Sequence, residues 1–417
     1  MSASFQSVSA QSNPPDLNSE WWSRCDLQWC QDRLQFAGRD VDNLSRQFGT
    51  RTFFYSTSRI RSNAQRIESA FLAAGFANRY RIHFAMKANR FAPLLCFLKQ
   101  TGLVGIDACS PNEVEHAIAC GFDASEVSFT NTSLSREDLD RLSRIEGLRI
   151  NCDSLRAIAA WGKRRPGSCI GFRINPGCGV GRADNEKLKY SGSNTTKFGI
   201  YREQFADALQ LAKASNLTVD TIHFHTGCGY LSPQLEQWSE VLVQCKWFID
   251  QVETLRNVNV GGGLGVPHVA SDSRLNLDEW AKILSQQFGD RSELTIEVEP
   301  GDYLVKDAGI LLLTVGSIER KRGTIFVGVN AGFNIAPEPT VYRLPLHPVP
   351  AVRRSGPATA CTIAGHINEA LDIWYHDIEL PPLREEDTLV LLNAGAYSSS
   401  MASNHCMRGD FREFLLC

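Results

Sequence analysis

Short apolar runs alternate with helical patterns along the first two thirds of the chain. Eight runs rich in β-branched or apolar residues alternate with stretches of about 10 to 20 residues that have helical periodicity. This alternation is typical of βα units, and eight units predict a closed (β/α)8 barrel. The predicted strands are 82–86, 103–107, 126–130, 148–152, 168–174, 217–225, 258–260 and 294–298, and the predicted helices are 58–74, 91–101, 111–120, 135–145, 154–164, 202–214, 232–254 and 278–288.

The pattern changes after residue 298 to short strands interrupted by prolines, which predicts a second, all-β domain. The expected fold class is therefore α/β: a barrel over 51–305, with a β domain over 306–417 that elements of the first 50 residues join. The first 20 residues are expected to form a floppy leader. The strands predicted after the barrel are 305–317, 324–329, 341–343, 358–364 and 389–393.

Composition narrows the class of protein. Of 417 residues, 43% are hydrophobic and 21% charged, so a disordered, collagenous or coiled-coil chain is excluded. The net charge of −3 offers no field for nucleic acid, and neither a secretion signal nor a membrane span is present. Thirteen cysteines without a CxxC pair indicate reduced thiols. We expect a cytoplasmic protein with no nucleic-acid or membrane partner.

Chemically distinctive residues follow the predicted strands. Lys87 follows the first strand, Asp107 ends the second, His225 ends the sixth, glycines 261–263 follow the seventh and Glu299 follows the eighth. Because barrel enzymes build their sites at the carboxyl ends of the strands, we expect these residues to share one face.

A phosphate-bearing cofactor would fit this set. The amides of Gly261, Gly262 and Gly263 could enclose an anion, although a flexible turn is an equal interpretation of three glycines. Lys87, removed from water, would form a neutral amine that condenses with an aldehyde, or it could simply reach bulk solvent. Glu299 could pair with a pyridine nitrogen and keep it protonated, or it could simply cap a helix or form a salt bridge. Together the three features suggest pyridoxal 5′-phosphate.

The segment His223-Phe224-His225 also has the spacing of two metal ligands on one strand face. No third and fourth ligands follow from the spacing, so no metal site is predicted. His225 as a flat platform under a cofactor ring suits the glycines that come after it, and a merely packed histidine is the remaining interpretation.

These motifs, taken together, resemble those of the pyridoxal-phosphate decarboxylases of the diaminopimelate and ornithine decarboxylase group, whose barrel is shared with alanine racemase. The resemblance covers about 44–416 and is closest to the diaminopimelate branch. It rests on FAMKAN, GIDACSPNEVEHAI, RINPG, KFGI, HTGCG, GGGLG, EPGD, the segment around Cys361, and NAGAY.

The resemblance implies roles for individual residues. Lys87 would carry the cofactor as an imine, His225 would stack on its ring and Glu299 would hold the pyridinium. Cys361 would return the proton to the α-carbon from a partner subunit, because this family builds its site at a homodimer interface. The remaining implied cofactor contacts are Asp107, Gly227, Cys228, Gly229, Gly261, Gly262, Gly263 and Tyr397.

The chain departs from the family pattern where the substrate's far end would bind. Asp302 replaces the arginine of EPGR, and Glu338 aligns with a second arginine, in a segment that continues to Tyr342. Thr362 replaces an acidic residue after the cysteine, the next segment, which contains Glu369, is longer, and Cys228 replaces a serine of the phosphate loop. From the replacement of the two arginines we predict that meso-diaminopimelate binds poorly, because Asp302 and Glu338 would repel its distal carboxylate.

The main prediction is thus a decarboxylase of an unusual L-amino acid or aminoacyl conjugate, free or carrier-bound, in a biosynthetic pathway. The alternative is diaminopimelate decarboxylase making L-lysine. A racemase is disfavoured because that branch places an arginine, not Glu299, at the ring nitrogen. A zinc hydrolase using His223 and His225, and a cofactor-binding protein without turnover, remain as other classes.

Overall fold

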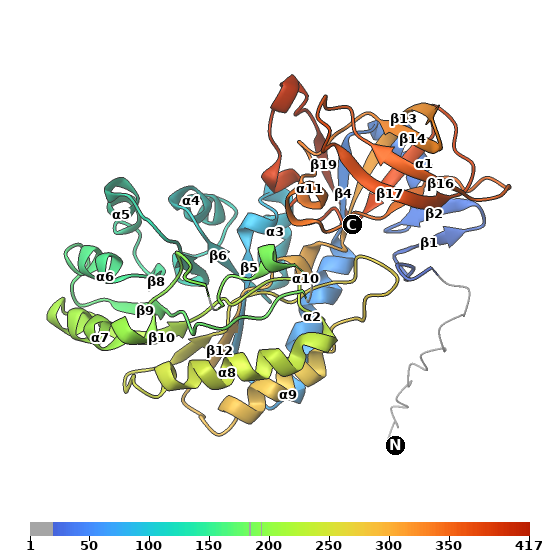
Figure 1. The fold of residues 1–417 in the computed structure, drawn as a ribbon. Coiled ribbons are helices and arrows are strands. Elements are labelled where there is room, and N and C mark those ends of the chain that lie inside the picture. The colour runs from blue at the N-terminus through green and yellow to red at the C-terminus, as the bar shows by residue number, and fades with distance from the viewer. Residues whose placement is uncertain (1–19, 183–184, 193) are drawn as a thin grey trace, which may run out of the picture.

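A closed eight-stranded parallel barrel and a mostly β domain form the molecule, as the sequence predicts (Figure 1). The structure, a computed structural model, describes residues 20–182, 185–192 and 194–417. The predicted leader lies outside the described residues, apart from Glu20. The strands of the barrel follow the order β5-β6-β7-β8-β9-β10-β11-β12, and β12 pairs with β5 to close it.

The barrel strands are short, and their helices cover the outside of the barrel (Figure 1). All eight strand predictions and all eight helix predictions correspond to an element of the structure. The strands are β5 (Tyr80–Ala85), β6 (Gly105–Ala108), β7 (Val127–Thr130), β8 (Arg149–Cys152), β9 (Cys169–Arg173), β10 (Thr218–His223), β11 (Asn257–Asn259) and β12 (Thr295–Val298); the helices are α2 (Thr57–Ala73), α3 (Ala92–Thr101), α4 (Pro111–Ala119), α5 (Arg136–Leu142), α6 (Leu155–Gly162), α7 (Phe205–Ala214), α8 (Leu235–Ile249) and α9 (Leu277–Phe288).

The β domain combines both ends of the chain. Its main sheet runs β15-β18-β13-β14-β16-β17, and β4 pairs with both β13 and β19. A small sheet of β1, β2 and β3, followed by α1, packs beside it (Figure 1). The bounds are β1 (Leu27–Cys30), β2 (Arg33–Phe36), β3 (Arg39–Asp40), α1 (Val41–Phe48), β4 (Thr52–Ser56), β13 (Gly309–Lys321), β14 (Thr324–Val329), β15 (Pro348–Pro350), β16 (Thr359–Ala364), β17 (Ile373–Leu380), β18 (Thr388–Leu392) and β19 (Arg412–Leu416).

Two predictions in this region are wrong. Residues 341–343 do not form a strand, because Glu338–Tyr342 is the short helix α11 and Arg343 has a left-handed backbone, with φ of 57°. The strand predicted from residue 305 begins only at Gly309, because Asp302–Val305 forms the one-turn helix α10. Both segments are apolar enough to pass for strands, and the tertiary packing decides their conformation.

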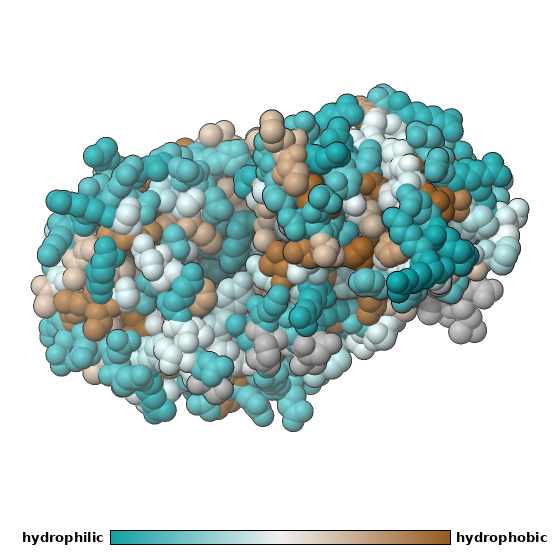
Figure 2. All heavy atoms as spheres, turned by 45° about the horizontal axis from the view of Figure 1, so that its top comes forward, coloured by the Kyte–Doolittle hydropathy of each residue, from teal (hydrophilic) through white to brown (hydrophobic). Residues whose placement is uncertain are grey.

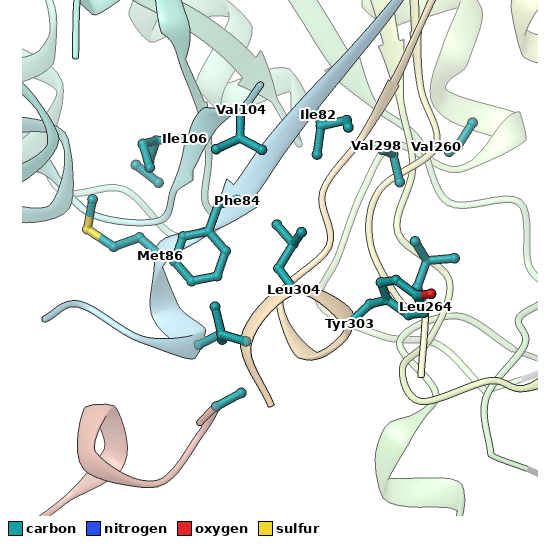
Figure 3. Close-up of a cluster of buried hydrophobic side chains, with 14 of the residues drawn as sticks. Ile82, Phe84, Met86, Val104, Ile106, Val260, Leu264, Val298, Tyr303 and Leu304 are labelled. Atoms are coloured by element: carbon teal, nitrogen blue, oxygen red, sulfur yellow. The ribbon is translucent and has the colours of Figure 1, made fainter. Parts of the chain in front are cut away.

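Apolar side chains from the barrel strands meet α10 in a continuous core (Figure 3). Ile82 and Phe84 of β5 are at most 2% exposed, and Leu304 of α10 points toward them and is fully buried. Tyr303 lies beside Leu264 in the same view. This packing fixes α10 directly beneath the loops that carry the chemically distinctive residues.

Among the described residues, no helix combines the length and hydropathy that crossing a membrane requires. The face in Figure 2 is largely hydrophilic, and hydrophobic side chains gather mainly near the waist between the barrel and the β domain.

Candidate active site

The carboxyl ends of the barrel strands surround one cavity, as the sequence predicts. Lys87 lies in the 3-10 turn Met86–Ala88 after β5, Asp107 lies in β6, His225 follows β10 and Glu299 follows β12. All four line the cavity, together with Cys228, Gly262, Gly263, Asp302 and Tyr397.

Glu299 is the best-defined group of the site. His223 Nε2 lies 3.0 Å from its Oε2, and Asn259 Nδ2 donates to its Oε1 at 2.7 Å. Burial alone would raise the pKa of Glu299, but the attraction and hydrogen bond of His223 outweigh it and lower the pKa to about 2. The carboxylate therefore stays ionised at neutral pH and is held in one orientation.

His223 therefore does not share its surroundings with His225, as two ligands of one metal ion would. Its Nε2 is engaged by Glu299, and its ring is 1% exposed. His225 points to another set of partners, since its Nδ1 accepts from the amide of Gly262 at 3.2 Å and its Nε2 lies 3.4 Å from Cys228 Sγ. The two histidines therefore do not act as a pair.

Burial, together with the positive charge of Lys87, lowers the pKa of His225 well below its usual value. The ring is a neutral, flat surface at physiological pH. Tyr190, which the sequence analysis missed, lies against it with ring centres 4.8 Å apart and planes at 57°. No spacing signal identifies Tyr190, because it comes from the long loop between β9 and α7.

Lys87 is half-buried beside acidic groups. Desolvation would lower its pKa, but the neighbouring Cys109 and Asp107 outweigh it and raise the pKa above the ordinary value. Burial thus shifts the pKa of Lys87 in the expected direction, toward the neutral amine, but the neighbouring groups outweigh burial in the protein alone. Burial and the nearby Glu299 in turn raise the pKa of Asp107 well above its usual value, and one of its carboxyl oxygens lacks a hydrogen bond.

Cys109 is a second thiol in the cavity that the sequence analysis did not select. It directly precedes the N-cap of α4, where Ser110 Oγ accepts from the amide of Glu113 at 3.2 Å and the Glu113 carboxylate accepts from the amide of Cys109 at 2.6 Å. Burial raises the pKa of Cys109 to about 12 and that of Cys228 likewise to about 12, so both are neutral thiols.

The glycines of the two loops have different tasks. Gly262 and Gly263 line the cavity, whereas Gly227, Gly229 and Gly261 do not. A Cβ at Gly227 would lie 1.6 Å from the carbonyl oxygen of Val180, so this glycine is required by packing alone. The amides of Gly261 and Gly262 already donate to Asn259 Oδ1 and His225 Nδ1, at 2.9 and 3.2 Å. An anion cradle would therefore rely on Gly263, Gly301 and Tyr397 more than on the whole glycine run.

The residues present fit pyridoxal phosphate. An amine, an ionised carboxylate fixed by two donors and a flat neutral imidazole face one cavity, and at its rim a Cβ on Gly301 would come within 3.1 Å of the Tyr397 hydroxyl. This donor set combines a group that can bond to an aldehyde, a partner for a pyridinium nitrogen and, beside Gly301, a space for a phosphate that a side chain would narrow.

Several predicted residues lie elsewhere within one chain. Cys361 is in β16, 4% exposed, with its thiol 3.5 Å from the carbonyl of Ile378. Thr362 is buried beside it in the same strand. Glu369 pairs with His405 at 3.5 Å, and neither it, Tyr342 nor Glu338 lines the cavity. For Cys361, Thr362 and Glu369 a role in catalysis requires a second copy of the chain.

The fold is that of a barrel enzyme, and Lys87 lines the cavity at the carboxyl ends of its strands. Residues 57–306 match the family model for the pyridoxal-binding domain of pyridoxal-dependent decarboxylases, and the chain belongs to this family of enzymes. It is thus a pyridoxal-phosphate-dependent decarboxylase with the fold that the sequence predicts.

Similar proteins of known function include diaminopimelate decarboxylases. The chain is 32% identical over 394 residues to a diaminopimelate decarboxylase from Methanothermobacter thermautotrophicus, covering 92% of this chain and 90% of that protein. It is 28% identical over 358 residues to the Escherichia coli K12 diaminopimelate decarboxylase, covering 80% and 83%. The Helicobacter pylori diaminopimelate decarboxylase I148L mutant complexed with L-lysine superposes with a TM-score of 0.81 at 25% identity, covering 90% and 94%.

Proposed function

We propose that the chain removes a carboxylate as carbon dioxide from the D-configured centre of meso-diaminopimelate, which leaves the L-configured centre intact and makes L-lysine. The observation that carries the proposal is the 32% identity to a diaminopimelate decarboxylase over nine tenths of both chains. Of the two functions predicted from the sequence, the comparisons thus favour the alternative over an unusual substrate.

Pyridoxal phosphate, when bound, supplies the electron sink that makes loss of an α-carboxylate feasible. Glu299 would hold a proton on the pyridine nitrogen, because its carboxylate is ionised and cannot rotate away from His223 and Asn259. Lys87 would provide the amine that holds the cofactor between turnovers. His225 would limit the tilt of the ring by flat contact.

Return of a proton to the α-carbon requires an acid near the cavity. We assign this to Cys361 of a partner subunit, since burial raises the pKa of its thiol to about 11 and keeps the proton in place. Because Cys361 lies outside the cavity of its own chain, this proposal also requires a homodimer in which the β domain of one copy reaches the barrel of the other.

A second candidate function is supported by the residues that replace the two arginines. Asp302 lines the cavity, and Glu338 lies close behind it. Acids at this place suit an L-amino acid whose far end is cationic or neutral, or is attached to a larger group.

Carbon dioxide release from the loaded protein separates the two. We expect meso-diaminopimelate to give the highest kcat/KM among meso-diaminopimelate, L-lysine, L-ornithine and L-arginine. A higher value for a cationic amino acid would replace the first proposal with the second. Exchange of the α-proton without release of carbon dioxide would indicate a racemase. If no amine tested undergoes either reaction, the protein binds the cofactor without turnover. The same assay is run on Lys87→Ala, which lacks the amine proposed to hold the cofactor. Its matched control is Lys99→Ala, which is changed at a lysine outside the cavity.

A further inference from the structure

A buried ion triad occupies the side of the cavity where the chain departs from its family. Lys306 is completely buried; its Nζ lies 3.3 Å from Asp302 Oδ1 and hydrogen-bonds to Glu338 Oε1. The same Nζ lies 5.6 Å from the ring centre of Tyr397. Asp302 and Tyr397 line the cavity, whereas Lys306 and Glu338 are buried beyond its lining.

Packing determines which way Asp302 faces. It opens α10, in which Leu304 and Val305 are fully buried, and Leu304 points toward the barrel side chains (Figure 3). The amide of Lys306 donates to the carbonyl of Asp302 at 2.8 Å and completes the turn. A single turn anchored on its apolar side leaves Asp302 little freedom to leave the cavity wall.

The charges of the triad leave no free cation for a substrate. Lys306 is completely buried, lies outside the cavity lining and already contacts two carboxyl groups, so its ammonium does not face a substrate carboxylate. Asp302 retains acceptor capacity toward the cavity, because its buried Oδ1 is the oxygen that faces Lys306, while the side chain lines the cavity and is 11% exposed. On this side, the cavity therefore presents the hydrogen-bond acceptor Asp302, which Lys306 holds in place. The arginines of the family would present hydrogen-bond donors at the same place.

We propose that this triad is a selectivity device in which Asp302 accepts an ammonium or other N–H group at the far end of the substrate, and Lys306 is the positioning residue that holds Asp302 in place. A far end that carries only a carboxylate is rejected. This inference rests on the proposed function in one respect, which is that the substrate bound in the cavity is an amine. meso-Diaminopimelate meets the requirement for a far-end N–H group through the ammonium of its distal centre.

The test uses two amines that carry no α-carboxylate and so cannot be decarboxylated. 1,5-Diaminopentane and 5-aminopentanoate have similar lengths and the same reacting amine, and they differ in far-end charge. Calorimetric titration of the cofactor-loaded protein should show tighter binding of the diamine by about 10-fold or more. Asp302→Asn should bring the two dissociation constants to within about 3-fold of each other.

Variants of Lys306 distinguish positioning from general stability. Lys306→Met should lose the preference, and Lys306→Arg should restore most of it. Lys99→Met, which breaks the partly exposed pair with Glu126, should leave the preference unchanged. If Lys306→Met does not fold, Asp302→Asn and Lys306→Arg still carry the test.

Two results would overturn the proposal: tighter binding of 5-aminopentanoate by the unaltered protein, or an unchanged preference in Asp302→Asn. A clear diamine preference in a protein that releases no carbon dioxide from meso-diaminopimelate would instead remove only the substrate proposed above. The two failures are thus distinguishable.

Discussion

His223 Nε2 and Glu299 Oε2 lie 3.0 Å apart inside the mouth of the barrel, and neither side chain is more than 6% exposed. The pair joins the end of β10 to the end of β12 across β11, whose Asn259 binds the other oxygen of the same carboxylate. Three neighbouring strands therefore hold one charge. A residue that resembles a metal ligand in the sequence is in the structure the partner of a carboxylate.

Glu299→Gln should destabilise the protein at neutral pH and matter less in acid. The folded-state pKa of about 2 lies below the ordinary 4.5, so the stabilisation is present above pH 4.5 and lost as pH falls toward 2. The depression corresponds to about 3 kcal/mol at pH 7. Urea unfolding should show the gap between the two proteins narrowing by about 1 kcal/mol between pH 7 and pH 4; a gap independent of pH would contradict the assigned ionisation.

Lys87→Ala should abolish the adduct that borohydride traps between the protein and pyridoxal phosphate. Lys87 is the lysine that lines the cavity among the described residues, whereas the buried Lys306 is bound to two acids. Peptide mapping of the reduced protein checks the site. Labelling that persists in Lys87→Ala but is absent from Lys306→Arg would show that the wrong lysine was chosen.

Cys361→Ala should slow product formation by about 10-fold or more while leaving the affinity for the cofactor unchanged. Its thiol lies outside the cavity of its own chain, so the loss should reflect proton return from a partner. Mixing Cys361→Ala with Lys87→Ala tests the sharing directly, because a shared site leaves one of the two sites of each mixed dimer intact. A fully exchanged equal mixture, half of it mixed dimers, should therefore recover about a quarter of the unaltered activity. No recovery after subunit exchange, verified by native mass spectrometry, would contradict a shared site.

Leu304→Ala should lower the free energy of unfolding by about 2 to 5 kcal/mol, since it removes a fully buried side chain between α10 and the barrel. The void that this substitution leaves beneath α10 should also make the position of Asp302 less fixed. We expect the diamine preference to fall in the folded variant, measured by the same titration. Leu72→Ala, at a residue 49% exposed on α2, provides the control and should change neither quantity.

The barrel and the strand-end residues could be predicted because each depends on local pattern. Alternation of apolar runs identified the eight strands, and Lys87, Asp107, His225 and Glu299 each come within two residues of a strand end. The identity of neighbours across the barrel could not be predicted in the same way. Whether His223 faces a metal or Glu299 depends on the pairing of β10, β11 and β12, which no short-range spacing encodes.

The ion triad shows the same limit more sharply. Asp302 and Glu338 were recognised as departures, but the sequence gives no sign that Lys306 lies between them, because 32 residues separate it from Glu338. The prediction of plain repulsion against a distal carboxylate therefore omitted the compensating cation. Tyr190 and Cys109 were missed for a related reason, since one belongs to an irregular loop and the other precedes a helix cap.

The pairing of β19 with β4 affects how the polypeptide matures on the ribosome. β4 leads directly into α2, yet its partner β19 comes from residues 412–416, which are translated after the whole barrel. The strands of the barrel can assemble while translation continues, but one edge of β4 has no neighbour until β19 has been made. During that interval an apolar edge, Phe53 and Phe54 among its side chains, is open to chaperones or to unwanted strand addition.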